Sequence, residues 1–272
     1  MRIGAELRKM REASGLTSAE AAASLGWERP RVSHVESGRH GVSGERVRHL
    51  ATHYLMDDAA YVDALAAMAD DRTRGWWTAY RHELPSGALD LAEFEHHAVD
   101  LRLVELLIVP GLLQTEEYAH AVFKGAVTQR PSQQIDTAVR HRMERQAVLD
   151  RPEPPGVEVI LHESALRIRY GDGEVMRNQL TSLLEFSHRE NAALRVVPFT
   201  APGVTSSIQP FTYGGGPVPQ LDTVQVDTAF AGVYLDATAQ LSKYRALLSM
   251  VRQVALSVDE SRTLISNVAK EA

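Results

Sequence analysis

Three of the four glycines in the first forty residues divide this part of the chain into segments of helical length: Gly15, Gly26 and Gly38. Ahead of Gly15, apolar residues recur every three or four positions, as on one face of a helix: Ile3, Leu7 and Met10. Because glycine accepts the positive φ angle that ends a helix or permits a sharp turn, each of these three glycines predicts a helix boundary. The chain is therefore expected to start with short helices joined by tight turns.

Two helix starts are recognisable between these glycines. Thr17 and Glu20 have the spacing of a capping box, in which a hydroxyl and a carboxylate bind the free amides at a helix start. A third helix is predicted to begin beside Glu28, as its N-terminal cap residue. Pro30 suits the first turn of that helix, because proline lacks an amide hydrogen that would have no partner there.

The third helix is predicted to have one apolar face and one polar face. Val32 and Val35 fall on the inward side. The side chains left on faces available to a ligand are Arg29, Arg31, Ser33 and His34. Two further amphipathic helices, near residues 47–54 and 61–68, complete a predicted head of five helices.

The net charge of −6 is unevenly distributed along the chain. Residues 1–56 carry nine basic and six acidic side chains, a net charge of +3, so the rest of the chain carries −9. A basic head attracts the phosphates of a nucleic acid, whereas an acidic body repels them. This distribution predicts that any complex with a nucleic acid forms through the first domain.

The ordered set of turn glycine, small buried alanine and terminal Glu-x-Gly resembles the Cro/XRE helix-turn-helix family. The matching positions are Leu16-Thr17, Ala22, Leu25-Gly26, Val32-Ser33, Val35-Glu36 and Gly38-Arg39. The resemblance implies that the partner is a double-stranded DNA operator, and that the start of the third helix reads base edges in the major groove.

This resemblance also implies which residues of the motif contact DNA. Base readout is assigned to Arg29, Ser33 and His34, beside Glu28 and Pro30 at the helix start, and Arg31 lies near the DNA backbone. Phosphate contacts are assigned to Arg39 and to the start of the second helix, Thr17 and Ser18. Glu36 is expected to support the local turn rather than to read bases, and Trp27 is expected to pack rather than to stack on a base.

Beyond the head, short strands and helices alternate. Three regions are predicted: a helix-turn-helix domain over 1–70, an aromatic connector over 71–88 and a regulatory domain over 89–272. Residues prone to form strands lie near 157–161, 194–197, 210–213 and 224–227. Helices are predicted over 91–107, 133–149, 174–188, 236–255 and 258–269, with another around Tyr118. The fold class is therefore a mainly α N-terminal domain of five helices followed by an α+β domain.

Motifs from about residue 89 onward resemble the regulatory domain of actinobacterial Scr-type, antitoxin-like XRE regulators. They include Glu95-x-x-Ala98, Val109-Pro110-Gly111-Leu112-Leu113-Gln114-Thr115, Arg142-x-x-Arg145-Gln146, Glu163-x-x-Leu166-Arg167 and Val196-Val197-Pro198-Phe199. Regulators of this family are commonly encoded beside a small partner protein. The resemblance therefore implies that this domain binds a partner protein or senses a small-molecule effector.

One cluster of basic residues is a candidate binding site in this domain. Arg142, Arg145 and Gln146 share one helical turn and could clamp a carboxylate or a phosphate, together with Arg167. The alternative is that these arginines form internal salt bridges with the many acidic residues. Both interpretations stay open at the level of sequence.

Motifs for catalysis, metal binding or membrane insertion are lacking. The chain has no Gly-x-Ser-x-Gly, no His-Glu-x-x-His and no phosphate-binding Gly-x-x-x-x-Gly-Lys-Ser/Thr, so we do not expect an enzyme, a cofactor or a metal. Glu95-His96-His97 is expected to be a solvated helix face, and Gly214-Gly215-Gly216-Pro217 a flexible surface loop. No apolar run is long enough to span a bilayer, which favours a cytoplasmic protein that associates with the nucleoid when bound to DNA.

Three hypotheses for function follow from the sequence. The first is a DNA-binding regulator gated by a small protein or ligand, and it is expected to be a homodimer because one reading helix covers only a few base pairs. The second is an antitoxin-like protein-interaction module that acts without DNA. The third is an unrecognised enzyme fused to a DNA-binding head, which the missing motifs disfavour.

Overall fold

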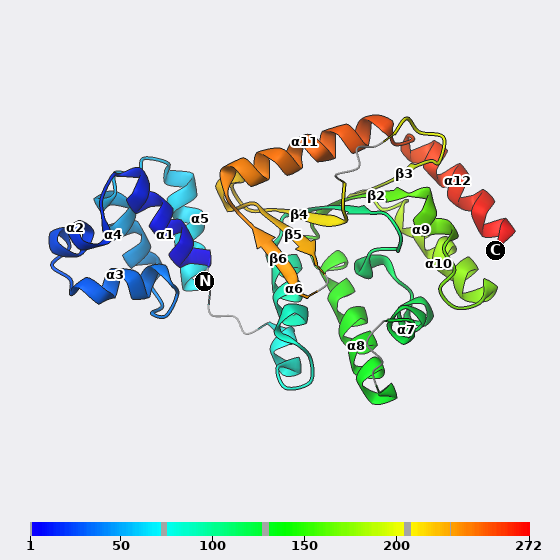
Figure 1. The fold of residues 1–272 in the computed structure, drawn as a ribbon, viewed down its shortest axis with the longest axis horizontal. Coiled ribbons are helices and arrows are strands. Elements are labelled where there is room, and N and C mark those ends of the chain that lie inside the picture. Colours follow the sequence, from blue (N-terminus) through cyan, green and yellow to red (C-terminus); the bar gives the residue numbers. More distant parts are fainter. Residues whose placement is uncertain (1, 72–74, 127–130, 204–207, 229) are drawn as a thin grey trace. The chain divides into compact units, whose positions relative to one another are not determined.

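The computed structural model describes residues 2–71, 75–126, 131–203, 208–228 and 230–272, with the exception of the Arg29 side chain. The chain forms two compact units, Met1–Arg74 and Gly75–Ala272 (Figure 1). The aromatic segment over 71–88 therefore belongs to the second unit from Gly75 onward. Residues 72–74 of that segment lie outside the described residues.

The first unit folds into five helices, which confirms the expectation from the glycine spacing. They are α1 (Arg2–Ala13), α2 (Ser18–Ser24), α3 (Arg29–Glu36), α4 (Gly44–His53) and α5 (Ala59–Asp70). Gly15, Gly26 and Gly38 follow the first three helices with φ angles of 78°, 64° and 71°. Apolar side chains from all five helices form the core: Leu7, Met10, Ala22, Val32, Val35, Val47, Leu50, Tyr61 and Leu65.

Helices α1 and α3 approach each other closely at Gly4. A Cβ atom on Gly4 would lie 2.5 Å from the carbonyl oxygens of both Val35 and Glu36, so only glycine fits there. The buried Glu6 accepts a hydrogen bond of 2.6 Å from the Tyr61 hydroxyl, which ties α1 to α5. The position of α3 is thus fixed against the N-terminal helix.

The second unit contains helices and a sheet. Its α-helices are α6 (Ser86–His97), α7 (Glu116–Lys124), α8 (Ser132–Arg145), α9 (Glu163–Arg167), α10 (Gly173–Phe186), α11 (Thr238–Val254) and α12 (Val258–Glu271). Its 3₁₀ turns are η1 (Trp76–Tyr80), η2 (Gly111–Leu113), η3 (Gln146–Leu149) and η4 (Pro219–Leu221). None of the helices in the described part of the chain is long and apolar enough to span a membrane.

Six strands form one mixed sheet in the second unit, in the order β3-β2-β1-β4-β5-β6. Their bounds are β1 (Asp100–Glu105), β2 (Gly156–His162), β3 (Ala192–Val197), β4 (Phe211–Gly215), β5 (Thr223–Asp227) and β6 (Gly232–Leu235). The first three strands are parallel, and β4 to β6 continue the sheet in antiparallel pairs. The unit is therefore α+β, as predicted.

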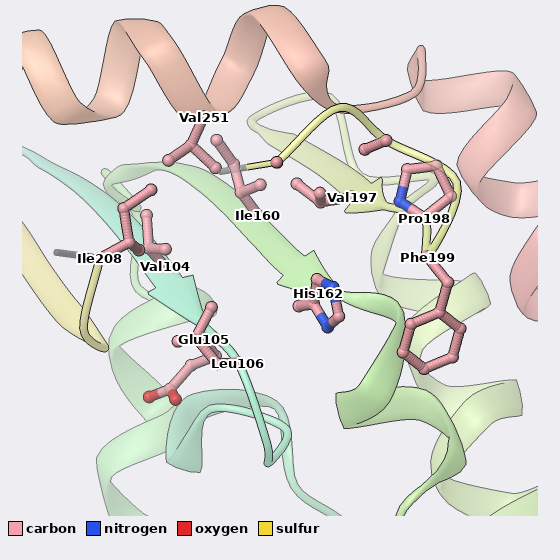
Figure 2. Close-up of a pocket in the computed structure, with 12 residues that line it drawn as sticks. Val104, Glu105, Leu106, Ile160, His162, Val197, Pro198, Phe199, Ile208 and Val251 are labelled. Atoms are coloured by element: carbon pink, nitrogen blue, oxygen red, sulfur yellow. The ribbon is translucent and has the colours of Figure 1, made fainter. Parts of the chain in front are cut away.

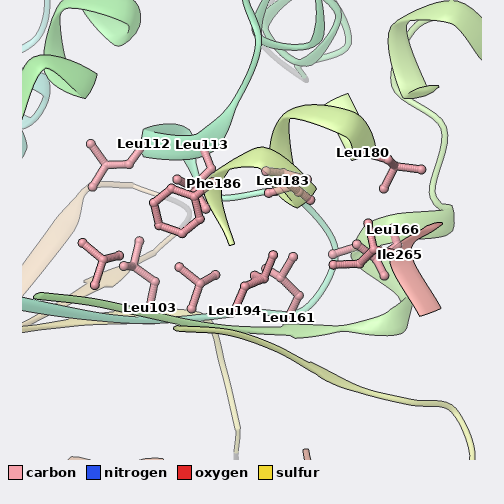
Figure 3. Packing of buried hydrophobic residues seen from close by; sticks show 14 of the residues in the cluster. Leu103, Leu112, Leu113, Leu161, Leu166, Leu180, Leu183, Phe186, Leu194 and Ile265 are labelled. Carbon is pink, nitrogen blue, oxygen red and sulfur yellow. The ribbon is translucent and has the colours of Figure 1, made fainter. Parts of the chain in front are cut away.

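Helices cover both faces of this sheet (Figure 1). On one face, leucines of the parallel strands pack against α10 and α12 through residues such as Leu180, Leu183, Phe186 and Ile265 (Figure 3). On the other face, residues of β1 to β5 pack against α11, which contributes Leu241, Tyr244, Leu248 and Val251. A parallel strand in this position is buried from both sides.

Burial of β1 on both sides explains an error in the sequence prediction. The helix expected over 91–107 ends at His97, and its second half is β1. Leu101 and Leu103 face one core whereas Val104 faces the other, so the strand is apolar on both faces and its periodicity resembles that of a helix.

The first half of the glycine-rich segment also differs from the prediction of a surface loop, whereas Gly216 and Pro217 lie outside the strand. Gly214 and Gly215 are buried in β4 and pair with Leu101 and Asp100 of β1. A Cβ atom on Gly214 would lie 2.6 Å from the ring of Phe94. Gly214 therefore allows α6 to approach the sheet.

Candidate nucleic-acid interface

The turn between α2 and α3 is built by local hydrogen bonds. The Thr17 side chain accepts a bond of 3.2 Å from the Glu20 amide, and the Glu20 carboxylate accepts one of 2.8 Å from the Thr17 amide, so the predicted capping box is present. At the other end of α2, the amide of Trp27 donates to the Ala22 carbonyl across 2.8 Å, around the positive φ of Gly26. The direction of α3 follows from this turn.

A buried ion pair anchors the inner face of α3. The Arg11 guanidinium donates to both carboxylate oxygens of Glu36, at 2.6 and 3.1 Å, and to the Leu16 carbonyl at 2.6 Å. Val32 and Val35 are buried beside it. Glu36 therefore holds α3 against α1, in agreement with the supporting role expected for it.

The outer face of α3 is polar and accessible. Arg31 and Ser33 are exposed, whereas His34 is half-buried with its ring 5.0 Å from that of His40. Arg29 is the first residue of α3, but its side chain lies outside the described residues. This face therefore carries two of the side chains that the sequence assigned to base readout, Ser33 and His34.

Trp27 supports two of the basic side chains. The Arg31 guanidinium lies 4.6 Å from the centre of a Trp27 ring, and the Arg46 guanidinium from α4 lies 5.4 Å from it. Such cation–π contacts hold a guanidinium in place without neutralising its charge. Arg46 is not among the residues expected from the sequence to contact DNA, because nothing in the spacing of residues 27 and 46 indicates that they meet.

The salt-bridge pattern distinguishes this surface from the rest of the first unit. Arg8 and Arg48 are exposed but pair with Glu12 and Asp63, at 2.7 and 3.1 Å. Arg31 and Arg39 are exposed, and neither forms a salt bridge with a described residue. Exposed guanidinium groups that are not neutralised by a carboxylate are suited to phosphates.

The remaining predicted contacts lie at the starts of α2 and α3. Thr17 is the exposed N-cap of α2, but its hydroxyl is bound to the Glu20 carboxylate at 2.6 Å. Ser18 is half-buried in the first turn of α2. Glu28 is the N-cap of α3 by its backbone, although its side chain makes no capping hydrogen bond, and Pro30 lies in the first turn as predicted.

The structure brings three of the four candidate C-terminal residues together around η2. Arg142 donates a bond of 2.6 Å to the Gln114 side chain, and the Gln146 amide donates one of 2.7 Å to the Gln114 carbonyl. Arg145 is buried and donates to both oxygens of the buried Glu95, at 2.8 and 2.5 Å. This arrangement favours the interpretation of Arg145 as one half of an internal ion pair.

Arg167 belongs to a different cluster. It pairs with Glu163 and Glu271, both at 2.7 Å, and so joins α9 to the end of α12. The expectation that Glu95 lies on a solvated face is wrong, because Glu95 is buried against Arg145. Across the described ranges, no group of three or more His, Asp or Glu side chains is placed to hold a metal ion.

Comparison with known protein families yields two matches. Residues 2–65 match a family model described as a helix-turn-helix domain. Residues 88–267 match the model of a domain of unknown function, DUF5753. The comparisons with curated proteins and with solved structures yield no match. The first match spans the helices that carry the surface described above.

Proposed function

The chain belongs to the DUF5753 family and begins with a helix-turn-helix domain, and on this basis we propose that it is a dimeric, sequence-specific transcriptional regulator. One observation carries the proposal. The inner face of α3 is anchored by buried valines and by the Arg11–Glu36 pair, whereas Arg31 and Arg39 are exposed without a salt bridge to a described residue. A rigid helix with one such cation on it, and a second shortly after its end, suits a DNA groove.

We further propose that the second unit is a regulatory domain of the actinobacterial Scr-type, antitoxin-like class. In this proposal it binds a small partner protein encoded nearby or a small-molecule effector, and it has no catalytic role. The acidic charge of the chain beyond residue 56, −9, favours a protein partner with a basic or apolar face. The sequence motifs around Pro110 and Phe199 support the assignment.

Binding to DNA can be tested with the upstream region of the gene itself and with random DNA of equal length. Arg29→Ala is expected to weaken binding to the specific site by about 1–3 kcal/mol, the value of one good base contact. Arg39→Ala is expected to weaken binding to both DNAs. It should also lower the slope of log binding constant against log salt concentration by about one unit. Arg8→Ala is the matched control, because Arg8 is paired with Glu12 on α1. Equal losses on both DNAs for Arg29→Ala would remove Arg29 from the base readers.

Dimer formation and signal reception need separate measurements. Analytical ultracentrifugation of the free protein and of its DNA complex should show two chains per site, and a monomer in both would contradict the dimer. Titration of operator affinity with the product of the neighbouring small gene should change the affinity, because a ligand that binds the two states unequally shifts their populations. An unchanged affinity would argue against this partner.

A further inference from the structure

A cavity lies at the carboxyl ends of the parallel strands in the second unit. Strand β1 ends at Glu105, β2 at His162 and β3 at Val197, so these ends meet at one edge of the sheet. The chain continues from β1 to β2 on one side, and β4 returns to the other side of β1. In open sheets, ligands commonly bind outside the carboxyl ends of the parallel strands.

The cavity has an apolar wall and a volume of about 310 Å³. The wall is formed by residues on the α11 side of the sheet and by the segment after β3: Val104, Ile160, Val197, Phe199, Ile208 and Val251 (Figure 2). One water molecule takes up about 30 Å³ of liquid, so the cavity has room for roughly ten water molecules or a ligand of roughly ten non-hydrogen atoms. This is the size of a small aromatic or aliphatic molecule.

His162 supplies the imidazole of this cavity. Side chains alternate along a strand, so His162 shares the face of Ile160, which lies in the core next to α11. Glu105 follows Val104, and Figure 2 shows its carboxyl group directed away from the apolar wall. His162 is therefore the ionisable side chain best placed to meet a molecule in the cavity.

A chain of hydrogen bonds fixes the proton on this imidazole. The Ser164 hydroxyl lies 2.5 Å from the Leu106 carbonyl oxygen, which only accepts, so the hydroxyl hydrogen points there. Nδ1 of His162 lies 2.6 Å from the same hydroxyl oxygen and must therefore supply the hydrogen of that contact. The Ser164 amide also points at Nδ1, at 3.3 Å, but this contact is longer than the two made by the hydroxyl, so we assign the hydrogen from those two.

Neutral His162 consequently presents a lone pair on Nε2. Among the described residues, this nitrogen has no hydrogen-bond partner. An acceptor at the rim of an apolar cavity is satisfied by a ligand that brings a donor. We propose that this cavity binds a compact apolar molecule with a single hydrogen-bond donor, such as an alcohol, which His162 accepts through Nε2. The regulatory meaning of such binding depends on the proposed function, but the binding itself does not.

The test is calorimetric titration of the full chain without DNA, using three probes of similar size. These are 2-phenylethanol, its methyl ether and phenylacetate. We expect 2-phenylethanol to bind with one site per chain and at least fivefold more tightly than the ether, which lacks the donor. Phenylacetate should bind more weakly than both. Equal affinity for alcohol and ether, or a preference for phenylacetate, would overturn the proposal.

Two substitutions of His162 keep the test independent of folding. His162→Phe preserves the ring but removes the acceptor, and His162→Asn supplies an oxygen that can accept from a free amide at the start of α9. Both should abolish the preference for alcohol over ether. His188→Phe, at an exposed histidine after α10, is the matched control and should retain it. A preference that survives in a folded His162 variant would refute the role of Nε2.

Nuclear magnetic resonance gives a direct readout of the proton position. In the wild type, nitrogen–hydrogen correlations of His162 should show the hydrogen on Nδ1. Ser164→Ala removes the oxygen that holds this hydrogen and should shift the population toward the other tautomer. Addition of 2-phenylethanol should then move the Nε2 resonance of the wild type. A hydrogen on Nε2 in the free wild-type protein would contradict the inference. Because no DNA is present, failure here leaves the proposed DNA binding untouched.

Discussion

Removal of Arg145 should destabilise the second unit strongly. The guanidinium and the carboxylate of Glu95 are both buried, with side-chain exposures of 9% and 4%, and two hydrogen bonds join them. Arg145→Met leaves the carboxylate in an apolar site without its partner, a change that typically costs about 3–5 kcal/mol. If Arg145 served only to clamp a ligand, its substitution would change the free energy of unfolding little in the absence of that ligand.

A double substitution distinguishes the loss of one charge from the loss of the whole ion pair. Glu95→Met together with Arg145→Met removes both charges, and replacing a buried pair by apolar side chains is often neutral or stabilising. We therefore expect the double variant to recover most of the loss. Arg189→Met is the control, because this exposed arginine pairs with the exposed Asp150 and the pair should contribute about 1 kcal/mol or less.

Urea unfolding followed by fluorescence can measure these changes. A Trp27→Phe background leaves Trp76 and Trp77 as the tryptophans, and both belong to the second unit. The midpoint and slope of the transition then give the free energy of unfolding. A loss below about 1 kcal/mol for Arg145→Met, or a double variant as unstable as the single one, would refute the assignment of Arg145 to an internal pair.

Three further substitutions test other parts of the structure. Burial, reinforced by the charge of Asp227, raises the pKa of Glu105 from 4.5 to about 8, so the folded chain keeps a proton that the unfolded chain loses. The free energy of unfolding should therefore fall as the pH rises between these values. In urea titrations from pH 5 to 9, Glu105→Gln should remove up to about 4 kcal/mol of that fall. Identical pH profiles of the wild type and the variant would contradict this. Gly4→Ala should cost about 1–3 kcal/mol in thermal unfolding, because the α1–α3 contact has no room for a methyl group, and an unchanged midpoint would show that the helices can separate. Trp27→Leu should weaken DNA binding by about 0.5–1 kcal/mol on any sequence by releasing Arg31, whereas an unchanged affinity would mean that Trp27 only packs.

The sequence by itself determined the first unit almost completely. Gly15, Gly26 and Gly38 mark the helix ends through a backbone angle that other residues disfavour, and Thr17 with Glu20 starts α2 through bonds within one turn. These signals act over a few residues, so they can be read without the fold. The alternation of strands and helices that gives an α+β second unit was also visible in the sequence.

Only the tertiary structure decided which side chains meet across long separations. Glu95 and Arg145 are fifty positions apart, and their charges alone fit a solvated face and a clamp as well as a buried pair. The burial of β1 on both faces depends on neighbours that follow it much later in the chain, which is why its pattern resembled a helix. The cavity beside His162 has the same origin, because the parallel ends of three strands come together only when the sheet forms.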